Sequence, residues 1–209
     1  MIIKVCGMRD EQNIAQLKKL NPDFIGLIFY PKSSRFVGET PLSHLSESFA
    51  PAKKVGVMVN ESEESILKKI ADFKLDAVQL HGSESADLCK KLKSRGISVI
   101  KAFSIAGEED IERIADYAGC VDFCLIDTKT PKVGGSGMKF DWNMLNNYPI
   151  NTPFLLSGGI GPDDAELVKN LNFPAMVGVD LNSKFEISPA VKNIGQLQTF
   201  FQQIHKSEK

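Results

Sequence analysis

Phe154-Leu155-Leu156-Ser157-Gly158-Gly159-Ile160-Gly161-Pro162 is the segment whose pattern decides the fold. A short apolar run ends in a small polar residue and two glycines, and an amphipathic stretch, 162–171, follows. A second apolar run, 176–180, comes soon after it. A strand, a turn, a helix and another strand in this order predict one unit of a parallel sheet covered by helices.

The same unit recurs along the chain of 209 residues. Apolar, β-branched runs predict eight strands: Ile2–Cys6, Phe24–Phe29, Lys54–Val59, Ala77–Leu80, Ser98–Ala102, Phe123–Asp127, Phe154–Ser157 and Met176–Asp180. Amphipathic stretches between them predict helices: Glu11–Leu20, Ser62–Phe73, Glu84–Leu92, Glu108–Ala118, Pro162–Leu171 and Lys192–His205, with a shorter one near Leu42–Phe49.

A doubly wound sheet and a closed barrel both fit this alternation. Every apolar run finishes at a polar or small residue, and these ends recur roughly every 20 to 30 residues, the length of a barrel unit. In a barrel all the carboxyl ends of the strands surround one active site, whereas an open sheet gathers its ligands at a switch point. We therefore predict an α/β protein, a single (β/α)8 TIM barrel over residues 1–209. The polar ends are Cys6, Tyr30, Asn60, His81, Lys101, Asp127, Ser157 and Asp180.

Composition narrows the partners and the location. The formal net charge is -1, so no global field favours nucleic acid or an anionic membrane. The apolar fraction of 43% is enough for a substantial core. No segment approaches the roughly 18 apolar residues of a membrane span, and no secretory signal opens the chain, which predicts a cytoplasmic protein. Monomer and homodimer both remain open.

Two glycine-containing loops predict a phosphate site. Gly158 and Gly159 follow the seventh strand, and the eighth strand leads into Asp180 and Ser183. Glycines let the backbone approach an anion, and barrels commonly hold phosphate between their last two loops. The alternative is a pair of ordinary glycine-rich turns. A third loop, 128–137, contains Gly135 and Ser136, and it is either a lid over an anionic ligand or a surface loop.

Cys6 and Asp127 end the first and sixth strands, so a barrel would bring them to a common mouth. A thiolate stabilised by nearby cations can serve as a general base, and a buried carboxyl as a general acid. The simpler alternatives are that Cys6 is a buried packing residue and that Asp127 caps a helix or forms an ion pair. Only three histidines are present, without a ligand pattern, which argues against a His-based metal site.

Several motifs resemble those of the phosphoribosylanthranilate isomerase family along nearly the full chain. In chain order they are Lys4-Val5-Cys6-Gly7-Met8-Arg9, Phe29-Tyr30-Pro31-Lys32-Ser33-Ser34-Arg35, Val78-Gln79-Leu80-His81-Gly82, Leu125-Ile126-Asp127-Thr128, Leu156-Ser157-Gly158-Gly159 and Gly178-Val179-Asp180. The resemblance implies a cofactor-free Amadori rearrangement of a phosphorylated sugar amine in tryptophan biosynthesis, with Cys6 as general base and Asp127 as general acid.

The resemblance also implies the residues that contact the substrate. Arg35 would engage its anthranilate end, and Gly158, Gly159, Asp180 and Ser183 its phosphate end, while the predicted contacts also include His81, Gly135 and Ser136. His81 could equally be a hydrogen-bonded residue that orders the mouth. Asn182 and Lys184 depart from the family pattern and leave the contacts of the eighth loop open.

Two rival functions remain on the sequence alone. One is another phosphosugar barrel enzyme, such as an epimerase, which generally implies a metal and histidines, or an indole-glycerol-phosphate synthase, which relies on lysines. The other is a catalytically inactive phosphate-binding barrel with an interaction role. Turnover of each substrate, with and without a chelator, separates the three.

Overall fold

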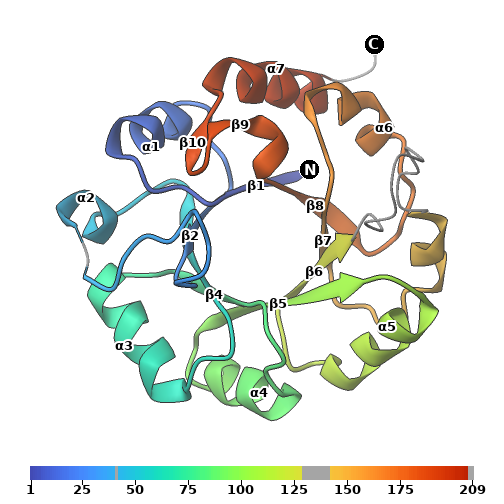
Figure 1. The fold of residues 1–209 in the computed structure, drawn as a ribbon. Helices are drawn as coiled ribbons and strands as arrows, with labels where there is room; N and C mark the ends of the chain where they lie inside the picture. Colours follow the sequence, from blue (N-terminus) through green and yellow to red (C-terminus); the bar gives the residue numbers. More distant parts are fainter. Residues whose placement is uncertain (41, 129–141, 207–209) are drawn as a thin grey trace.

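Eight parallel strands close into a barrel in the computed structural model, which describes residues 1–40, 42–128 and 142–206 (Figure 1). Each strand pairs with the next along the chain, and β1 closes the ring by pairing with β8. The closed barrel is therefore confirmed over the open sheet. The strands are β1 (Ile2–Cys6), β2 (Phe24–Ile28), β3 (Lys53–Met58), β4 (Ala77–Leu80), β5 (Ser98–Ile105), β6 (Phe123–Thr128), β7 (Phe154–Ser157) and β8 (Met176–Leu181).

Strand alternation divides the apolar residues between two layers. One set packs inside the barrel, and the other packs between the strands and the ring of helices. Both faces of every strand are covered, which is why the strands read as continuous apolar runs. Leu125 and Phe123 belong to the interior set, so Asp127, two residues further along the same face, points into the mouth. The buried interior set is Phe24, Val55, Ala77, Ile100, Ala102 and Leu125.

Aspartates secure the strands at the end of the barrel opposite the mouth. Asp23, Asp76 and Asp122 each precede an even-numbered strand. Their carboxylates accept the backbone N–H groups of Ile3, Lys54 and Val99, at 2.7 to 2.9 Å, from the preceding odd-numbered strand. These bonds satisfy backbone donors near strand beginnings and help to hold the register of neighbouring strands.

Helices form the outer ring (Figure 1). Side-chain caps begin four of them, because Asp10, Ser62, Ser85 and Asn193 accept backbone N–H groups that have no partner within the helix. The predicted helix 108–118 divides into α5 and a 3-10 turn, and the predicted helix 162–171 divides in the same way. The helices and 3-10 turns are α1 (Glu11–Lys18), α2 (Ser43–Ser46), α3 (Glu63–Phe73), α4 (Ala86–Ser94), α5 (Glu108–Glu112), η1 (Arg113–Tyr117), η2 (Trp142–Asn147), η3 (Pro162–Asp164), α6 (Ala165–Lys169), η4 (Ser183–Phe185) and α7 (Ile194–His205).

A small hairpin precedes the last helix, and here the predicted helix start at Lys192 was wrong. Strands β9 (Glu186–Ser188) and β10 (Val191–Lys192) pair antiparallel. The backbone N–H of Lys192 donates to Asn13 Oδ1 at 2.7 Å, and the Asn13 amide donates to its carbonyl at 2.9 Å. These long-range bonds keep Lys192 extended, so α7 begins only after the Asn193 cap. The hairpin brings Glu186 and Lys192 together near the mouth.

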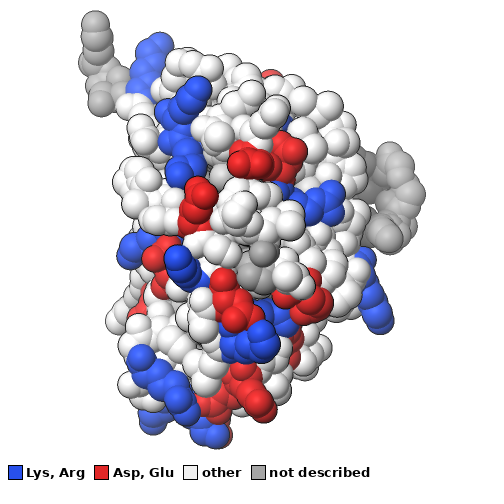
Figure 2. Space-filling model, turned by 90° about the vertical axis from the view of Figure 1, so that its left-hand side faces the viewer, with Lys and Arg blue, Asp and Glu red and all other residues white. Residues whose placement is uncertain are grey.

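The outer surface is mixed in charge. Figure 2 shows acidic and basic side chains interspersed over the face it presents. On this face the mixture of signs agrees with the near-zero net charge of the chain. Among the residues that the structure describes, no helix is long and apolar enough to cross a membrane.

Candidate active site

A cavity of about 250 Å³ lies at the carboxyl ends of the strands. Five of the eight polar strand ends line it, whereas Tyr30, Asn60 and Lys101 do not. The expectation that Lys101 ends its strand at the mouth was wrong. Strand β5 continues as far as Ile105, and the residue that faces the barrel interior is Ala102 rather than Lys101. The site residues predicted from sequence that line the cavity are Cys6, His81, Asp127, Gly158, Gly159, Asp180 and Ser183.

Cys6 is buried at the end of β1, with its sulfur facing β2. The space for the sulfur comes from Gly26, since a Cβ at that position would lie 2.8 Å from Cys6 Sγ. Burial raises the pKa of the Cys6 thiol, and the ammonium groups of Lys4 and Lys192 act in the opposite direction. The thiol therefore has a fixed position and an ionisation that depends on neighbouring charges.

Asp127 approaches the cavity from β6 and faces His81, with 3.6 Å between its Oδ2 and the histidine Nε2. The other ring nitrogen, Nδ1, is 3.2 Å from the amide nitrogen of Gln79. Gln79 is buried and also lines the cavity, a placement that the sequence interpretation did not single out. His81 is thus both a wall of the cavity and a hydrogen-bonded residue that links Gln79 to the carboxyl group of Asp127.

The loops after β7 and β8 form the adjoining wall. Gly158 and Gly159 have φ angles of 93° and 72°, which side-chain-bearing residues rarely adopt. A Cβ at Gly159 would meet no atom within 4 Å, so this backbone borders open space. Ser183 begins the 3-10 turn η4, and Lys184 also lines the cavity. An ammonium group and two left-handed glycines on one wall suit an anionic ligand.

Asp180 lies on the cavity wall in a buried ion pair. Its Oδ1 is 2.8 Å from Lys4 Nζ, and its Oδ2 is 3.5 Å from the hydroxyl of Ser157, which also lines the cavity. Lys4 is fully buried within the barrel. The close carboxylate compensates the buried charge, because burying an isolated ammonium group costs far more than burying the pair.

Arg35 does not line the cavity but packs beside it. Its Nε and Nη2 donate to the two carboxylate oxygens of Glu186 at 2.8 and 2.5 Å. Glu186 also accepts from Lys192 Nζ at 2.6 Å. Burial alone would raise the pKa of Glu186, but the hydrogen bonds from Arg35 and Lys192 lower it to about 2. The sequence interpretation missed Glu186 because 151 residues separate it from Arg35.

The predicted contacts Gly135 and Ser136 lie outside the described residues.

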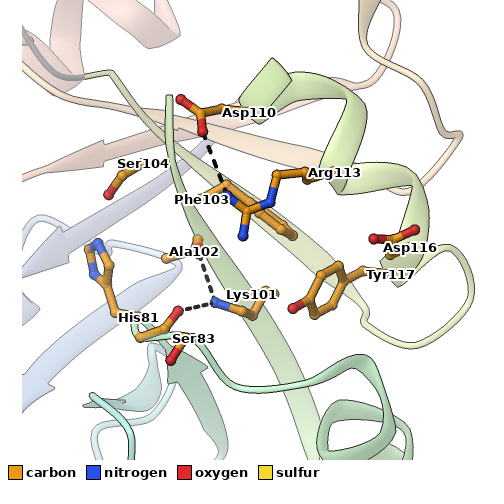
Figure 3. A pocket seen from close by; sticks show the side chains of 11 residues that line it. His81, Ser83, Lys101, Ala102, Phe103, Ser104, Asp110, Arg113, Asp116 and Tyr117 are labelled. Atoms are coloured by element: carbon orange, nitrogen blue, oxygen red, sulfur yellow. Dashed lines mark hydrogen bonds and ion pairs between the residues drawn. The ribbon is translucent and has the colours of Figure 1, made fainter. Parts of the chain in front are cut away.

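A second recess of about 270 Å³ adjoins the cavity, and His81 belongs to the walls of both. Figure 3 shows it between the end of β5 and the α5–η1 segment, with Phe103 and Tyr117 on its sides and Lys101 at its base. Arg113 and Asp110 lie at its rim, 3.9 Å apart.

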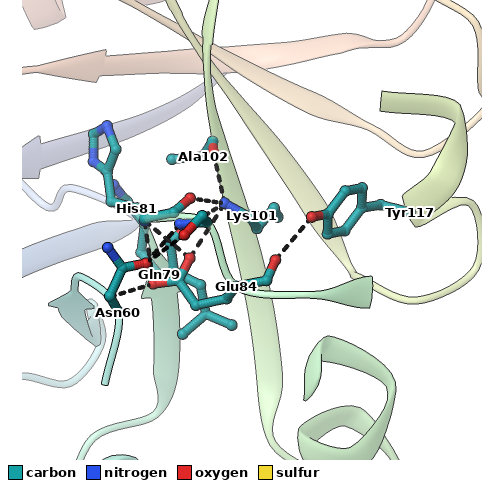
Figure 4. Close-up of polar contacts among 10 residues, drawn as sticks. Asn60, Gln79, His81, Glu84, Lys101, Ala102 and Tyr117 are labelled. Atoms are coloured by element: carbon teal, nitrogen blue, oxygen red, sulfur yellow. Dashed lines mark hydrogen bonds and ion pairs between the residues drawn. The ribbon is translucent and has the colours of Figure 1, made fainter. Parts of the chain in front are cut away.

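A buried network beneath this recess fixes the loop that carries His81 (Figure 4). Lys101 Nζ donates to three carbonyls, including that of Gly82 at 2.9 Å, and lies 3.3 Å from Glu84. Glu84 in turn accepts the backbone N–H groups of Gly82 and Asn60. Both the N–H and the carbonyl of Gly82 are therefore hydrogen-bonded, to Glu84 and Lys101 respectively. These bonds fix the backbone next to His81, whose ring faces Asp127.

Among the described residues, no group of three His, Cys, Asp or Glu side chains is arranged to hold a metal ion. The groups that converge on the cavity are instead a thiol, a carboxyl, an imidazole and an anion-binding wall. This set can move a proton on and off a bound phosphorylated ligand.

Known proteins share both the sequence and the fold. The family model described as N-(5'phosphoribosyl)anthranilate (PRA) isomerase matches residues 3–203. A relative from Parabacteroides distasonis, named N-(5'-phosphoribosyl)anthranilate isomerase, is 51% identical over 98% of this chain and 93% of its own length. A protein of the same name from Phocaeicola vulgatus is 45% identical over 98% of each chain.

A solved structure extends the similarity to three dimensions. It is a phosphoribosyl anthranilate isomerase in complex with reduced 1-(o-carboxyphenylamino)-1-deoxyribulose 5-phosphate. It is 30% identical to this chain, covers 98% of both chains and has a TM-score of 0.79.

Proposed function

Because the chain belongs to the N-(5'-phosphoribosyl)anthranilate isomerase family, we propose that Cys6 is the general base and Asp127 the general acid of that isomerisation. The enzyme converts N-(5'-phosphoribosyl)anthranilate to 1-(2-carboxyphenylamino)-1-deoxyribulose 5-phosphate in tryptophan biosynthesis. One observation carries the assignment of the two groups. Cys6 and Asp127 come from β1 and β6 yet line the same cavity, next to a wall suited to phosphate.

The first proton transfer opens the sugar ring. Asp127 donates a proton to the furanose ring oxygen, the bond between that oxygen and C1 breaks, and the nitrogen lone pair forms an iminium ion. His81, 3.6 Å from the Asp127 carboxyl group, orients this acid towards the ligand. The iminium then acts as the electron sink for the next step, so the reaction needs no metal or cofactor.

The second proton transfer makes the enolamine. The Cys6 thiolate removes the proton from C2, and the electron pair of that C–H bond moves into the C1–C2 bond and neutralises the iminium. The enolamine then tautomerises to the ketone: C1 takes up the proton held by the Cys6 thiol, and the 2-hydroxyl proton passes to the Asp127 carboxylate, so both groups regain their starting protonation. Substrate and product have the same atoms, as an isomerisation requires.

Binding at both ends of the ligand orients C2 between the two groups. The backbone amides of Gly158, Gly159 and Ser183, together with Lys184, bind the phosphate, and the glycine φ angles support this close approach. Arg35 receives the anthranilate carboxylate through Nη1, for which the described residues supply no hydrogen-bond acceptor. Gly135 and Ser136 remain proposed contacts of the loop after β6.

The test is turnover of the authentic substrate, followed by the loss of its fluorescence. Cys6→Ser and Asp127→Asn are each expected to lower kcat by about 10² to 10⁴, with a smaller change in KM. Cys120→Ser and Asp72→Asn are matched controls, since neither residue lines the cavity, and both should retain wild-type kcat. Near-normal kcat in Cys6→Ser would refute the base, and in Asp127→Asn the acid. Loss of wild-type activity on adding a chelator would instead favour a metal-dependent enzyme.

A further inference from the structure

Five charged side chains gather beside Cys6, and we call them the Cys6 charge cluster: Lys4, Arg35, Asp180, Glu186 and Lys192. Lys4 and Lys192 are essentially without solvent contact, and the Asp180 and Glu186 side chains are each 6% exposed. Arg35 is the most accessible, at 22%. A charge buried to this degree requires a partner of opposite sign or it destabilises the fold strongly.

The cluster is built from two linked groups. Lys4 pairs with Asp180 at 2.8 Å across neighbouring strands, where the two residues lie opposite each other in the β1–β8 register. Glu186 binds Arg35 on one side and Lys192, at 2.6 Å, on the other. Lys192 Nζ also donates to Asn182 Oδ1 at 2.8 Å. Every charged member therefore has at least one partner of opposite charge.

Packing places the Lys4–Asp180 pair beside Cys6 and the group around Glu186 beside the next residue, Gly7. Lys4 is two residues before Cys6 on the interior face of β1. A Cβ at Gly7, the next residue along, would lie 2.6 Å from Arg35 Cδ and 2.9 Å from Asn182 Oδ1. Asp180 and Asn182 line the same cavity as Cys6.

The cluster carries one positive charge more than it carries negative charges, because its three cations face two carboxylates. The other titratable or charged groups on the described cavity wall are His81 and Asp127, which face each other, and Lys184 on the phosphate side. A thiolate at Cys6 would neutralise the excess charge. A neutral thiol would leave one buried positive charge uncompensated within the cluster.

We propose that this excess charge offsets the cost of ionising the buried Cys6 thiol, and that Lys4 and Lys192 are therefore positioning residues that make the base available. The inference rests on the proposed role of Cys6 as base, although the ionisation itself is independent of substrate. The individual charges act with opposite signs, since Lys4 and Lys192 lower the pKa of Cys6 and Asp180 raises it. Replacing these residues should therefore shift the pKa of Cys6 in opposite directions, which a purely structural role does not predict.

The experiment titrates Cys6 in the substrate-free protein. Iodoacetamide reacts with thiolates, so its rate of reaction with Cys6, measured by mass spectrometry across a pH series, reports the thiolate fraction. Lys192→Met is the main variant because Glu186 keeps its ion pair with Arg35, which protects the fold. Lys4→Met and Asp180→Asn complete the set. Lys54→Met is the matched control, a buried lysine bound to the carbonyls of Leu45 and Phe73 on the outer side of the barrel.

Lys192→Met and Lys4→Met are expected to slow alkylation of Cys6 by about tenfold at a fixed pH below its titration midpoint, which equals one pKa unit. Asp180→Asn is expected to speed it, and Lys54→Met to leave it unchanged. An unchanged or faster rate in Lys192→Met would overturn the proposal, even if Lys4→Met does not fold. Shifts of the same sign in Lys192→Met and Asp180→Asn would also overturn it.

Turnover separates this inference from the proposed function. If Cys6 is the base, kcat/KM of Lys192→Met falls together with its thiolate fraction. If alkylation slows as expected while kcat/KM stays at the wild-type value, the assignment of Cys6 as base fails and the electrostatic inference stands.

Discussion

Replacing Gly26 with alanine tests how closely β2 approaches the proposed base. The new Cβ would lie 2.8 Å from Cys6 Sγ and 3.2 Å from the Cys6 Cα. Ordinary contacts begin at 3.4 Å, so the sulfur must retreat by roughly 0.6 Å or the backbone of β1 must move. Both responses disturb the position of the thiol within a closed barrel, where β1 has little room to shift.

The expected magnitudes follow from this overlap. Overpacking of a well-packed core costs about 1–3 kcal/mol, which corresponds to a fall in Tm of about 2–12 °C for a chain of this length. Misplacing a reacting group by about 1 Å can cost a factor of about 10² in rate, so a displacement of about 0.6 Å should lower kcat by about tenfold. KM should change less, because Gly26 does not line the cavity.

The matched control makes the same chemical change where there is space. Gly195 lies in α7, and a Cβ there would meet no atom closer than 3.5 Å. Gly195→Ala should stabilise the protein by about 0.4–1 kcal/mol, because alanine favours the helix and restricts the unfolded chain. Thermal unfolding followed by circular dichroism and turnover followed by substrate fluorescence measure both variants. Wild-type Tm and kcat in Gly26→Ala, with the expected gain in Gly195→Ala, would refute the close packing of Gly26 on Cys6.

Three further predictions concern stability. The pKa of Glu186 is lowered from 4.5 to about 2 in the folded protein, so the stability that the ionised carboxylate contributes is present above pH 4.5 and is lost as the pH falls towards 2. Urea unfolding should show a flatter pH dependence in Glu186→Gln over that range, and an identical slope would contradict the ion pairs. Gly178→Ala would bring a Cβ to 2.1 Å from the backbone oxygen of Ile2, so it should cost several kcal/mol, and a wild-type Tm would show that β8 does not pack this tightly on β1. Lys101→Met leaves Glu84 buried without a cation and should lower the free energy of unfolding by about 3–5 kcal/mol, whereas Lys101→Met combined with Glu84→Gln should recover part of the loss in chemical denaturation.

The strands could be predicted closely from the sequence. Three of the eight agree at both ends, and the others differ by one residue at either end except β5, which extends three residues further, to Ile105. The reason is burial on both faces, which forces a run of apolar residues with sharp polar boundaries. Helix boundaries were less accurate, because the short segments after Glu108 and Pro162 combine α and 3-10 turns that periodicity alone does not distinguish.

The sequence predicted which residues reach the cavity better than it predicted which side chains bind one another. Alternation along β1 and β6 was enough to place Cys6 and Asp127 at the mouth, and the structure brings both to one cavity. Lys101 shows the limit of that reasoning. Because β5 extends a few residues beyond it, Lys101 is not a strand end at the mouth, and its ammonium group instead binds the backbone carbonyl of Leu80.

Local sequence thus determined where strands occur, which residues share a face and which loops contain glycine, because these properties depend on neighbours a few positions apart. Only the tertiary structure decided that Arg35 pairs with Glu186 across 151 residues and that Lys4 pairs with Asp180 across 176. Closure of the barrel brings β8 beside β1, and electrostatic energy depends on distance in space rather than along the chain. The charge balance around the thiol is therefore a property of the closed ring.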